Sequence, residues 1–404
     1  MALENRDIFI LGATKFDGPY ESTSYTVARY LARNNRVYYI DYPFTWKDYI
    51  RQKGTPEYTV RKPYLKPGSN GVLDTDLPGL KIIFIPLLYS INFLPEGWLY
   101  RLLLRLNERI ITKRLKRVIR RLNIKDYIYI NSFNFHYPDI AKSLSPVLTV
   151  YHCVDPLIIE YDKRHGIVSE RKLVTQSDMV ICTSKQLADE KRALNPHTYF
   201  VPNAADISHS GKALDESLEI HESIRDLPKP VIGYFGTIER RMDFELLNKV
   251  IESNPDKSFA FVGPLSPEFV PEWFSNMPNV YLPGRQDYKD MPAIIKGFDV
   301  AIIPFKKDDV SKTIFPLKLF EYLGAGKPVV ITDFNPDLKE FTQGTVAFCN
   351  NAKEFNQAMN ESLKNNTFSM QQQRIQVAQQ NTWYKRVEEI SNIISDAIQS
   401  DRPF

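Results

Sequence analysis

Residues 316–328 contain the side chains whose types and spacing are best suited to chemistry. A proline opens this segment and glycines close it, which predicts a short helix bounded at both ends. Lys318 and Glu321 are three residues apart and therefore share one face of that helix. The N-terminus of the helix has unpaired N–H groups and a partial positive charge, and Lys318 adds a full positive charge. The helix N-terminus and Lys318 together could therefore hold a diphosphate. A carboxylate such as Glu321 can accept two hydrogen bonds at once, as the paired hydroxyls of a ribose would require. The alternative is a surface ion pair of little energetic value.

The elements that must position these residues are strands of parallel sheets. Short apolar runs recur along the chain, each followed by a stretch of helical length, which predicts an α/β fold with two doubly wound domains. Strands are expected at 7–11, 36–40, 81–85, 127–131, 147–151, 178–183 and 199–202, and then at 231–235, 259–262, 280–282, 300–303, 329–332 and 346–348. In such sheets ligands bind beyond the carboxyl ends of the strands, so the loops after strands are the candidate sites.

The domain boundaries follow from composition. We expect a first domain over 1–206, joined by a polar linker at 207–229 to a second domain over 230–379. One or two helices should follow from about 370, and the last of them, about 380–404, has a single apolar stripe that must pack on a domain. Residues 42–80, rich in Pro, Tyr and Lys, are expected to form a long irregular excursion.

Length and composition exclude several classes of protein. The chain has 404 residues, 43% of them hydrophobic and 25% charged, which is typical of a folded protein of two or three domains. A net charge of +4 is small for a nucleic-acid binder, so no nucleic-acid partner is expected. Three widely spaced cysteines disfavour disulfides and zinc sites and indicate a cytoplasmic protein. We see no secretion signal and no apolar run long enough to span a bilayer.

Several segments together resemble one enzyme family. The motif at 316–328 is similar to the donor-site motif of bacterial GT-B glycosyltransferases related to family 4, especially those that build cell-surface polysaccharides. The strand and loop at 231–238, the Tyr-x-Cys-x-Asp segment at 151–155, the Pro-Asn-x-x-Asp turn within 201–206 and the pair at 382–383 resemble further segments of that family, in the same order. The resemblance implies a GT-B fold, with two Rossmann-like domains facing a cleft, and a last helix that returns to the first domain.

The resemblance also implies roles for individual residues. Glu321 would hold the ribose of a nucleoside diphosphate sugar, and Lys318 with the Gly236–Thr237 loop would hold its phosphates. Arginines pair well with phosphate oxygens, so two that follow this loop could neutralise the departing diphosphate. The donor-binding set is therefore Gly236, Thr237, Arg240, Arg241, Lys318, Glu321 and Tyr322. The position eight residues before Glu321, where retaining enzymes of the family usually carry a glutamate, is Thr313, which leaves retention and inversion of the sugar open.

A reaction that inverts needs a general base near the acceptor hydroxyl. Asp17, in the loop after the first strand, and His152 and Asp155, after the strand at 147–151, are the candidate catalytic residues, and His136 is a further one. Each could instead be a helix cap or a loop residue that bonds its own backbone. Neither a metal site nor a cofactor is expected.

A basic amphipathic helix is predicted from Arg101 to Lys125, where Lys and Arg alternate with apolar residues and Glu108 is the only acid. Its apolar face should pack on the sheet, and its basic face, with Arg114, Arg117 and Arg121, could lie on an anionic membrane surface. Alternatively, the basic face is only solvated.

The expected function is therefore transfer of a sugar from a nucleotide sugar to a hydroxyl of a glycan or lipid-linked acceptor in surface polysaccharide synthesis. The expected place is the cytoplasm, with peripheral contact to the inner face of the plasma membrane. Two alternatives stay open, a nucleotide-sugar epimerase of the same fold and a non-catalytic subunit that binds a sugar nucleotide or a glycan.

Overall fold

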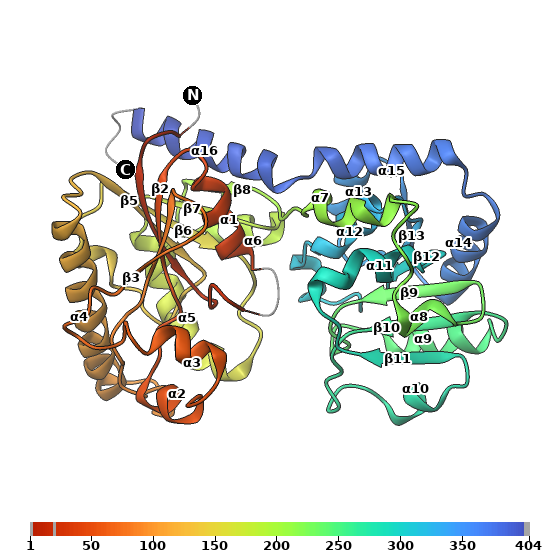
Figure 1. Cartoon of the computed structure of the whole chain (residues 1–404), viewed down its shortest axis with the longest axis horizontal. Coiled ribbons are helices and arrows are strands. Elements are labelled where there is room, and N and C mark those ends of the chain that lie inside the picture. Colours follow the sequence, from red (N-terminus) through yellow and green to blue (C-terminus); the bar gives the residue numbers. More distant parts are fainter. Residues whose placement is uncertain (1–2, 19–21, 400–404) are drawn as a thin grey trace. The chain divides into compact units, whose positions relative to one another are not determined.

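The computed structural model describes residues 3–18 and 22–399, and it forms two units. The first unit comprises Met1–Pro202 with Val387–Phe404, and the second comprises Asn203–Arg386 (Figure 1). Each has its own sheet and core, as the sequence predicts.

The first unit is built on an eight-stranded sheet in the order β3-β4-β2-β1-β5-β6-β7-β8. All pairs are parallel except β3 with β4. Every strand expected in this half is present, and β3 is an addition that the sequence did not predict. The strands are β1 (Asp7–Gly12), β2 (Arg36–Ile40), β3 (Val72–Asp74), β4 (Leu80–Ile83), β5 (Tyr127–Ser132), β6 (Leu148–Cys153), β7 (Met179–Cys182) and β8 (Thr198–Phe200).

Helices pack on both faces of this sheet, and α1 and α4 lie on opposite sides of it (Figure 1). Alternate strand residues such as Phe9 and Leu11 form one buried cluster with Leu104 and Leu115 of α4. The side chains between them point to the other face, because successive strand residues alternate. The helices of this unit are α1 (Thr23–Leu31), α2 (Trp46–Arg51), α3 (Pro56–Arg61), α4 (Trp98–Arg121), η1 (Ala141–Ser143), α5 (Glu160–Gln176), α6 (Lys185–Arg192) and the greater part of α16 (Trp383–Gln399).

The segment 42–80 is more regular than the sequence analysis expects. It contains α2, α3 and β3. Thr45 and Asp48 form a reciprocal capping box at the start of α2, and Thr55 accepts a hydrogen bond from the backbone of Tyr58 at the start of α3. These caps satisfy backbone donors that a short helix would otherwise leave unpaired.

The second unit has six parallel strands in the order β11-β10-β9-β12-β13-β14, which numbered along the unit is the 3-2-1-4-5-6 order of the Rossmann fold. All six are strands that the sequence predicts: β9 (Val231–Phe235), β10 (Ser258–Val262), β11 (Val280–Gly284), β12 (Val300–Ile303), β13 (Val329–Thr332) and β14 (Val346–Cys349). They are near-continuous apolar runs because helices cover both faces of a parallel sheet. The helices are α7 (Ile207–Ser210), η2 (Gly211–Leu214), α8 (Glu222–Arg225), α9 (Phe244–Glu252), α10 (Glu272–Asn276), η3 (Tyr288–Asp290), α11 (Met291–Lys296), η4 (Ser311–Thr313), α12 (Leu317–Gly324), α13 (Leu338–Thr342), α14 (Ala352–Lys364) and α15 (Phe368–Gln380).

Two segments differ in detail from the expected domain boundaries. Residues 207–229, expected to be a linker, include α7, η2 and α8 and belong to the second unit. The tail, expected to form one or two helices, forms α15 and α16, and the first unit takes up α16 from Val387 onward. Val387, Ile390 and Ile394 are buried, so the apolar stripe of this helix is packed as predicted.

Candidate functional site

In the second unit, the loops after β9 and β12 lie where the order of the strands reverses. The chain runs outward from β9 to β10 and β11 on one side, and from β12 to β13 and β14 on the other. Neighbouring parallel strands whose connections leave in opposite directions form a crevice at their carboxyl ends, where such folds bind nucleotides. Hydrogen bonds from Lys306 N to Arg241 O (2.7 Å) and from Asp243 N to Pro304 O (2.8 Å) join the two loops.

The loop after β9 approaches α12 closely at a glycine. Gly236 has a φ of +144°, and a Cβ atom at this position would lie 2.2 Å from Nζ of Lys318. Any side chain would therefore displace the lysine as well as strain the backbone. The structure thus brings together Gly236 and Lys318, which the sequence analysis placed in one phosphate site.

Lys318 has aromatic neighbours. Its Nζ donates a hydrogen bond to the hydroxyl of Tyr234 (2.6 Å) and lies 3.9 Å from the centre of that ring. Burial, with a smaller contribution from the charge of Arg241, lowers the pKa of Lys318 to about 7. The site thus holds a cation whose charge is costly until an anion joins it, which favours binding of a diphosphate.

We expect the affinity for a nucleoside diphosphate to fall as the pH rises above 7. Below that pH, Lys318 is already charged and binding needs no proton. Above it, the bound diphosphate raises the pKa of Lys318, so binding takes up a proton and weakens by up to about tenfold per pH unit. Calorimetry at pH 8 in buffers with different ionisation heats should show the uptake. A Lys318→Met variant should show none, and equal uptake by this variant would contradict the assignment.

Glu321 is buried, with 5% of its surface exposed, and it accepts a hydrogen bond from the hydroxyl of Tyr288 (2.8 Å). Tyr288 begins η3, after β11, and is itself held by His209, whose Nε2 donates to the Tyr288 carbonyl oxygen (2.8 Å) while the two rings pack together. Neither Tyr288 nor His209 is among the site residues predicted from the sequence. The position of Tyr288 after the predicted strand at 280–282 was a signal that could have found it. Loops after parallel strands all lie at the carboxyl edge of the sheet, where the loop after β9 also lies.

The start of α12 is fixed by a residue that the sequence analysis assigned only to a turn. Nδ2 of Asn203 donates to the carbonyl oxygen of Phe315 (3.4 Å), directly before Pro316. Leu319, Phe320 and Leu323 bury the opposite face of the helix in the core of the unit. Packing therefore determines which side chains α12 directs out of the core.

The arginines after Gly236 are placed differently from each other. Arg240 is half-buried in the turn after β9. Arg241 forms an ion pair with Glu239 and lies 5.5 Å from the ring of Phe305, close enough to Lys318 to lower its pKa. Thr237 uses its carbonyl oxygen to accept from the hydroxyl of Tyr234 (2.9 Å).

Tyr322 does not belong to the binding surface, contrary to the sequence analysis. Its side chain is fully buried, and its hydroxyl accepts a hydrogen bond from the backbone N–H of Phe235 (2.7 Å). Because Phe235 is the last residue of β9, this bond ties α12 to the strand whose loop carries Gly236. Tyr322 therefore positions the site by holding α12 against β9.

Thr313 lies in η4. It is buried, and its hydroxyl donates to the carbonyl oxygen of Val310 (2.7 Å). The hydroxyl of Thr313 is therefore hydrogen-bonded within its own turn.

In the first unit, Asp17 is part of a cluster of charges. Arg61, 1% exposed, donates to both carboxylate oxygens of Asp17 (2.8 and 2.6 Å) and to both of Asp41 (2.7 and 3.2 Å). Burial raises the pKa of Asp41 to about 6 although Arg61 opposes the shift. Both carboxylate oxygens of Asp17 are therefore held by an arginine, which leaves this side chain less free to reach an acceptor hydroxyl.

His152, Asp155 and His136 occupy separate surroundings. His152 is buried at the end of β6, with Nδ1 3.0 Å from the hydroxyl of Ser132, which in turn donates to Ser24 (2.8 Å). Burial lowers the pKa of His152, and likewise of His136, to about 4, so both rings are neutral at pH 7. Asp155 lies after β6 and is exposed.

The basic helix is present as α4, but the arginines named for its outer face are not all on it. Arg114 is buried and donates to the carbonyl oxygens of Ser69 (2.6 Å) and Lys66 (2.9 Å). Arg117 is half-buried and donates to the carbonyl oxygen of Pro67. Arg121 is exposed, as expected. Arg114 and Arg117 thus hold the segment before β3 rather than facing solvent.

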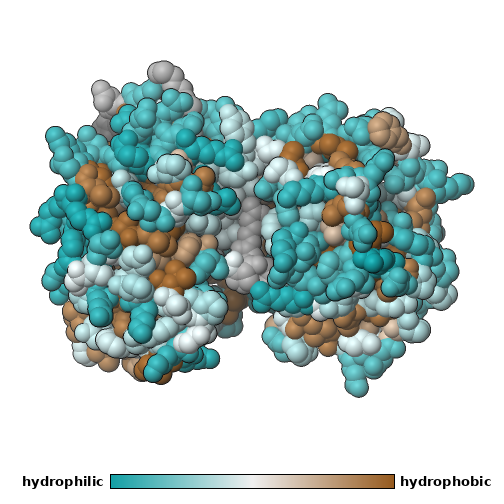
Figure 2. All heavy atoms as spheres, in the orientation of Figure 1, coloured by the Kyte–Doolittle hydropathy of each residue, from teal (hydrophilic) through white to brown (hydrophobic). Residues whose placement is uncertain are grey.

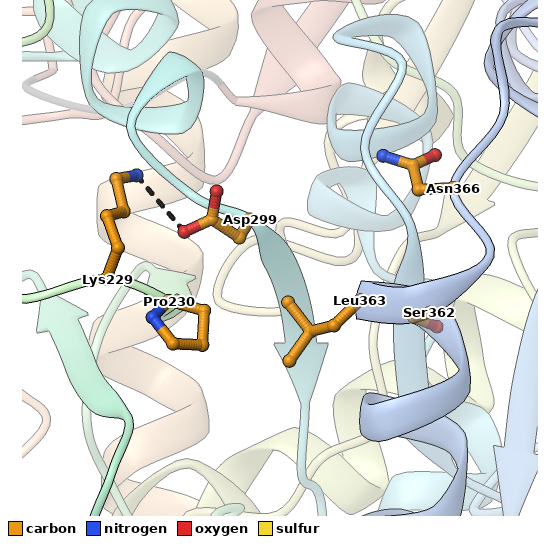
Figure 3. Close-up of a pocket in the computed structure, with 6 residues that line it drawn as sticks. All are labelled: Lys229, Pro230, Asp299, Ser362, Leu363 and Asn366. Carbon is orange, nitrogen blue, oxygen red and sulfur yellow. Dashed lines mark hydrogen bonds and ion pairs between the residues drawn. The ribbon is translucent and has the colours of Figure 1, made fainter.

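A hollow of about 530 Å³ in the second unit lies away from this site (Figure 3). It is at the opposite edge of the sheet, because Pro230 and Asp299 directly precede β9 and β12. Lys229 and Asp299 form an ion pair there (3.1 Å), and Asp299 also accepts from Val231 N (2.7 Å). The charges of this hollow satisfy each other, so we assign it no chemistry. Its lining residues are Lys229, Pro230, Asp299, Ser362, Leu363 and Asn366.

Within 3–18 and 22–399, no three His, Cys, Asp or Glu side chains gather closely enough to hold a metal ion. None of the helices in that part of the chain has the length and apolar character needed to cross a lipid bilayer.

Residues 229–365 match the family described as "Glycosyl transferases group 1". A protein of Bacillus subtilis (strain 168), provisionally named as the teichuronic acid biosynthesis glycosyltransferase TuaH, is 27% identical over 235 residues. That match covers 52% of this chain and 58% of the relative, so it spans little more than half the length of either.

Solved structures match the whole chain. A sucrose-phosphate synthase from Thermosynechococcus elongatus aligns with a TM-score of 0.65 at 13% identity, covering 97% of this chain and 99% of that one. A UDP-forming trehalose-phosphate synthase from Burkholderia vietnamiensis gives 0.67 at 9% (97% and 96% covered), and Anabaena HepE in complex with UDP gives 0.60 at 13% (97% and 100%). The chain therefore has the GT-B fold, and its residues 229–365 match the glycosyl transferases group 1 family.

Proposed function

We propose that the protein transfers a sugar from a nucleoside diphosphate sugar to a hydroxyl of a glycan or lipid-linked acceptor. The observation that carries this proposal is the pairing of Lys318 with Gly236, beside buried Glu321, where the strand order reverses. Together these groups offer a cation to a diphosphate and a carboxylate to a ribose. The group 1 family domain and the partial match to a protein named for teichuronic acid synthesis support surface polysaccharide synthesis as the setting.

The proposed catalysis consists mainly of orienting the donor and stabilising the charge that develops on its leaving diphosphate. Lys318 and Arg241 supply positive charge, and Arg240 adds a third cation from the same turn. We propose no metal ion and no cofactor. Among the candidate bases, exposed Asp155 is retained in preference to Asp17, whose oxygens are bonded to Arg61, and to His152, whose ring is buried.

A donor-turnover assay separates the proposed function from its alternatives. A thermal-shift screen first identifies the nucleoside diphosphate that stabilises the protein most, with UDP as the first probe because it is bound in the related HepE structure. The corresponding sugar nucleotides are then incubated with and without a panel of glycan and lipid-linked acceptors. Release of the nucleoside diphosphate that depends on acceptor supports transfer. Interconversion of the sugar without acceptor would identify an epimerase, and binding without turnover would identify a non-catalytic subunit.

We further propose that the protein works at the cytoplasmic face of a membrane, held there by exposed apolar side chains. Trp98 (78% exposed) and Leu102 (46%) lie one turn apart at the start of α4. Tyr161 (51%) and Val168 (44%) are on α5, which packs beside this part of α4 because the ring of Tyr100 stacks on His165 at 3.6 Å. Aromatic and aliphatic groups of this kind favour the interfacial region of a bilayer. Hydrophobic patches also appear on the face of the first unit that Figure 2 shows.

Replacing Trp98 and Leu102 by serine should abolish sedimentation with vesicles that contain anionic lipid. Both side chains are exposed, so the fold should be unaffected. The matched control is the pair Trp46→Ser and Ile50→Ser, which removes an exposed tryptophan (53%) and an aliphatic residue (72%) at the same spacing on α2. Equal loss of sedimentation in the control would refute the patch on α4 as the contact.

A further inference from the structure

A basic groove runs along α4 in the first unit. It is a hollow of about 580 Å³ with α4 as one wall and residues from η1 and α5 opposite. The wall on α4 carries Arg105, Arg109, Lys113, Lys116 and Arg120. These positions follow one another at intervals of four or three residues, so all five lie on a single face of the helix.

Folding does not account for this stripe of charge. All five side chains are exposed, and within the described part of the chain none of them forms an ion pair. Like charges one turn apart on a helix repel each other and destabilise it. Arg120 donates to the carbonyl oxygen of Lys116, one turn earlier in the same helix (3.3 Å), whereas Arg114 and Arg117 bind backbone oxygens of the segment before β3. The stripe is therefore available to something outside the unit.

The opposite wall adds further positive charge. Lys142 and Lys172 both approach the carboxylate of Asp139 at 3.1 Å and share its single negative charge. Glu108 lies on the floor, 6% exposed, and accepts from the backbone N–H of Asp139 (2.8 Å). Burial raises the pKa of Glu108 to about 7, so at neutral pH it neutralises the groove only in part. Seven cations thus face two carboxylates, one of which carries a partial charge.

The shape of the groove indicates the form of its ligand. At about 1.5 Å per residue, the stripe from Arg105 to Arg120 is about 22 Å long, which exceeds any single phosphate or carboxylate. Because α4 connects the parallel strands β4 and β5, it begins near the carboxyl edge of the sheet and runs toward the opposite edge. A ligand in the groove would extend away from the edge at which open sheets carry their sites. Two facing walls suit a chain better than the flat surface of a bilayer.

We propose that this groove binds an extended polyanion, a chain with phosphate or carboxylate groups at regular intervals. Binding of a polyanion in the groove does not depend on the proposed function. Only the assignment of this polyanion as the growing anionic acceptor rests on the proposed function. The groove holds the chain by many screened contacts, each weak, so affinity increases with the length of the chain and decreases with salt.

The experiment compares the wild type with the triple variant Arg109→Gln, Lys113→Gln, Lys116→Gln. The soluble probes are inorganic polyphosphate, oligogalacturonate of increasing length and inorganic phosphate, with binding followed by fluorescence anisotropy or calorimetry at two salt concentrations. Vesicles that contain anionic lipid are a further probe, with binding followed by sedimentation. We expect the wild type to bind the long chains and inorganic phosphate hardly at all. The variant should lose on the order of tenfold or more in affinity. The matched control is Arg51→Gln, Lys53→Gln, Lys62→Gln, which removes one exposed arginine and two exposed lysines elsewhere in the unit and should bind as the wild type does.

Three results would overturn the proposal. One is equal loss in both triple variants, which would show only an effect of net charge. Another is unchanged polyanion binding by the groove variant. In the third, the groove variant no longer binds anionic vesicles but still binds soluble polyanions, which would assign the groove to a lipid surface. Turnover of a short uncharged acceptor should be unaffected by the groove variant, so failure of the polyanion proposal and failure of the transferase proposal give different results.

Discussion

A Glu321→Ala variant should bind its nucleoside diphosphate about 100-fold more weakly than the wild type. Hydrogen bonds to a charged group contribute about 1.5–3 kcal/mol each, and Glu321 can offer two of them to the ribose. Part of this gain is offset because the ligand must displace the Tyr288 hydroxyl from the carboxylate. A net loss of about 2.7 kcal/mol corresponds to the stated factor. Calorimetry with the diphosphate that stabilises the protein most measures the change.

A ligand variant and a protein variant make this test specific. The 2′,3′-dideoxy form of the same nucleotide lacks both hydroxyls, so wild type and Glu321→Ala should bind it equally. Tyr288→Phe removes the hydrogen bond to Glu321 but keeps the carboxylate and should bind the normal nucleotide at least as well as the wild type. If Glu321→Ala weakened the dideoxy nucleotide to the same extent, the carboxylate would act on the fold of the site and not on the ribose.

An Arg61→Met variant should lower the stability of the first unit by about 3–5 kcal/mol. The substitution leaves Asp41, whose side chain is 2% exposed, without the cation that pairs with it, and removal of one partner of a buried ion pair has a cost of this size. It also frees Asp17 and removes a cation packed among the rings of Phe16, Phe44 and Phe84. Thermal unfolding should show a fall in Tm of about 10 °C or more.

The pH dependence of the loss identifies its cause. Asp41 has a raised pKa in the folded state, so its burial as an anion reduces stability as the pH rises through about 6. Without Arg61 this pKa rises further, and the deficit of the variant should be larger at pH 8 than at pH 5. Arg36→Met is the control, because Arg36 is half-exposed and its pair with Asp7 contributes at most about 1 kcal/mol. A deficit equal at both pH values would mean that lost packing, and not the unpaired carboxylate, destabilises the variant.

The sequence predicted the sheets well because their signal is local. All the strands expected from apolar runs are present, with ends shifted by a residue or two. The strand that was missed, β3, has three residues, pairs at the edge and has one exposed residue among them, so it lacks the buried run on which the prediction depends. The helices α2 and α3 had readable signals, the capping threonines Thr45 and Thr55, but they lie in a segment whose prolines and lysines favour a loop.

The site was predicted only in part, because its contacts join residues far apart in the chain. Lys318 and Glu321 could be chosen from their spacing within one helix. Nothing local shows that Arg114 is buried, since the carbonyl oxygens that hold it belong to residues 66 and 69. The same is true of Arg61, whose partners Asp17 and Asp41 precede it by 44 and 20 residues. A charged side chain in a sequence is read as exposed unless its partners are known.

The division of α16 between the units has a consequence for how the protein is made. Val387, Ile390 and Ile394 complete the first unit, yet they follow the whole second unit in the chain. During translation, the first sheet therefore keeps an apolar surface uncovered until Asn203–Arg386 has been synthesised. The second unit has no such delay, because all of its elements are contiguous. The partly finished first sheet is thus the state of this protein that most needs protection by a chaperone during translation.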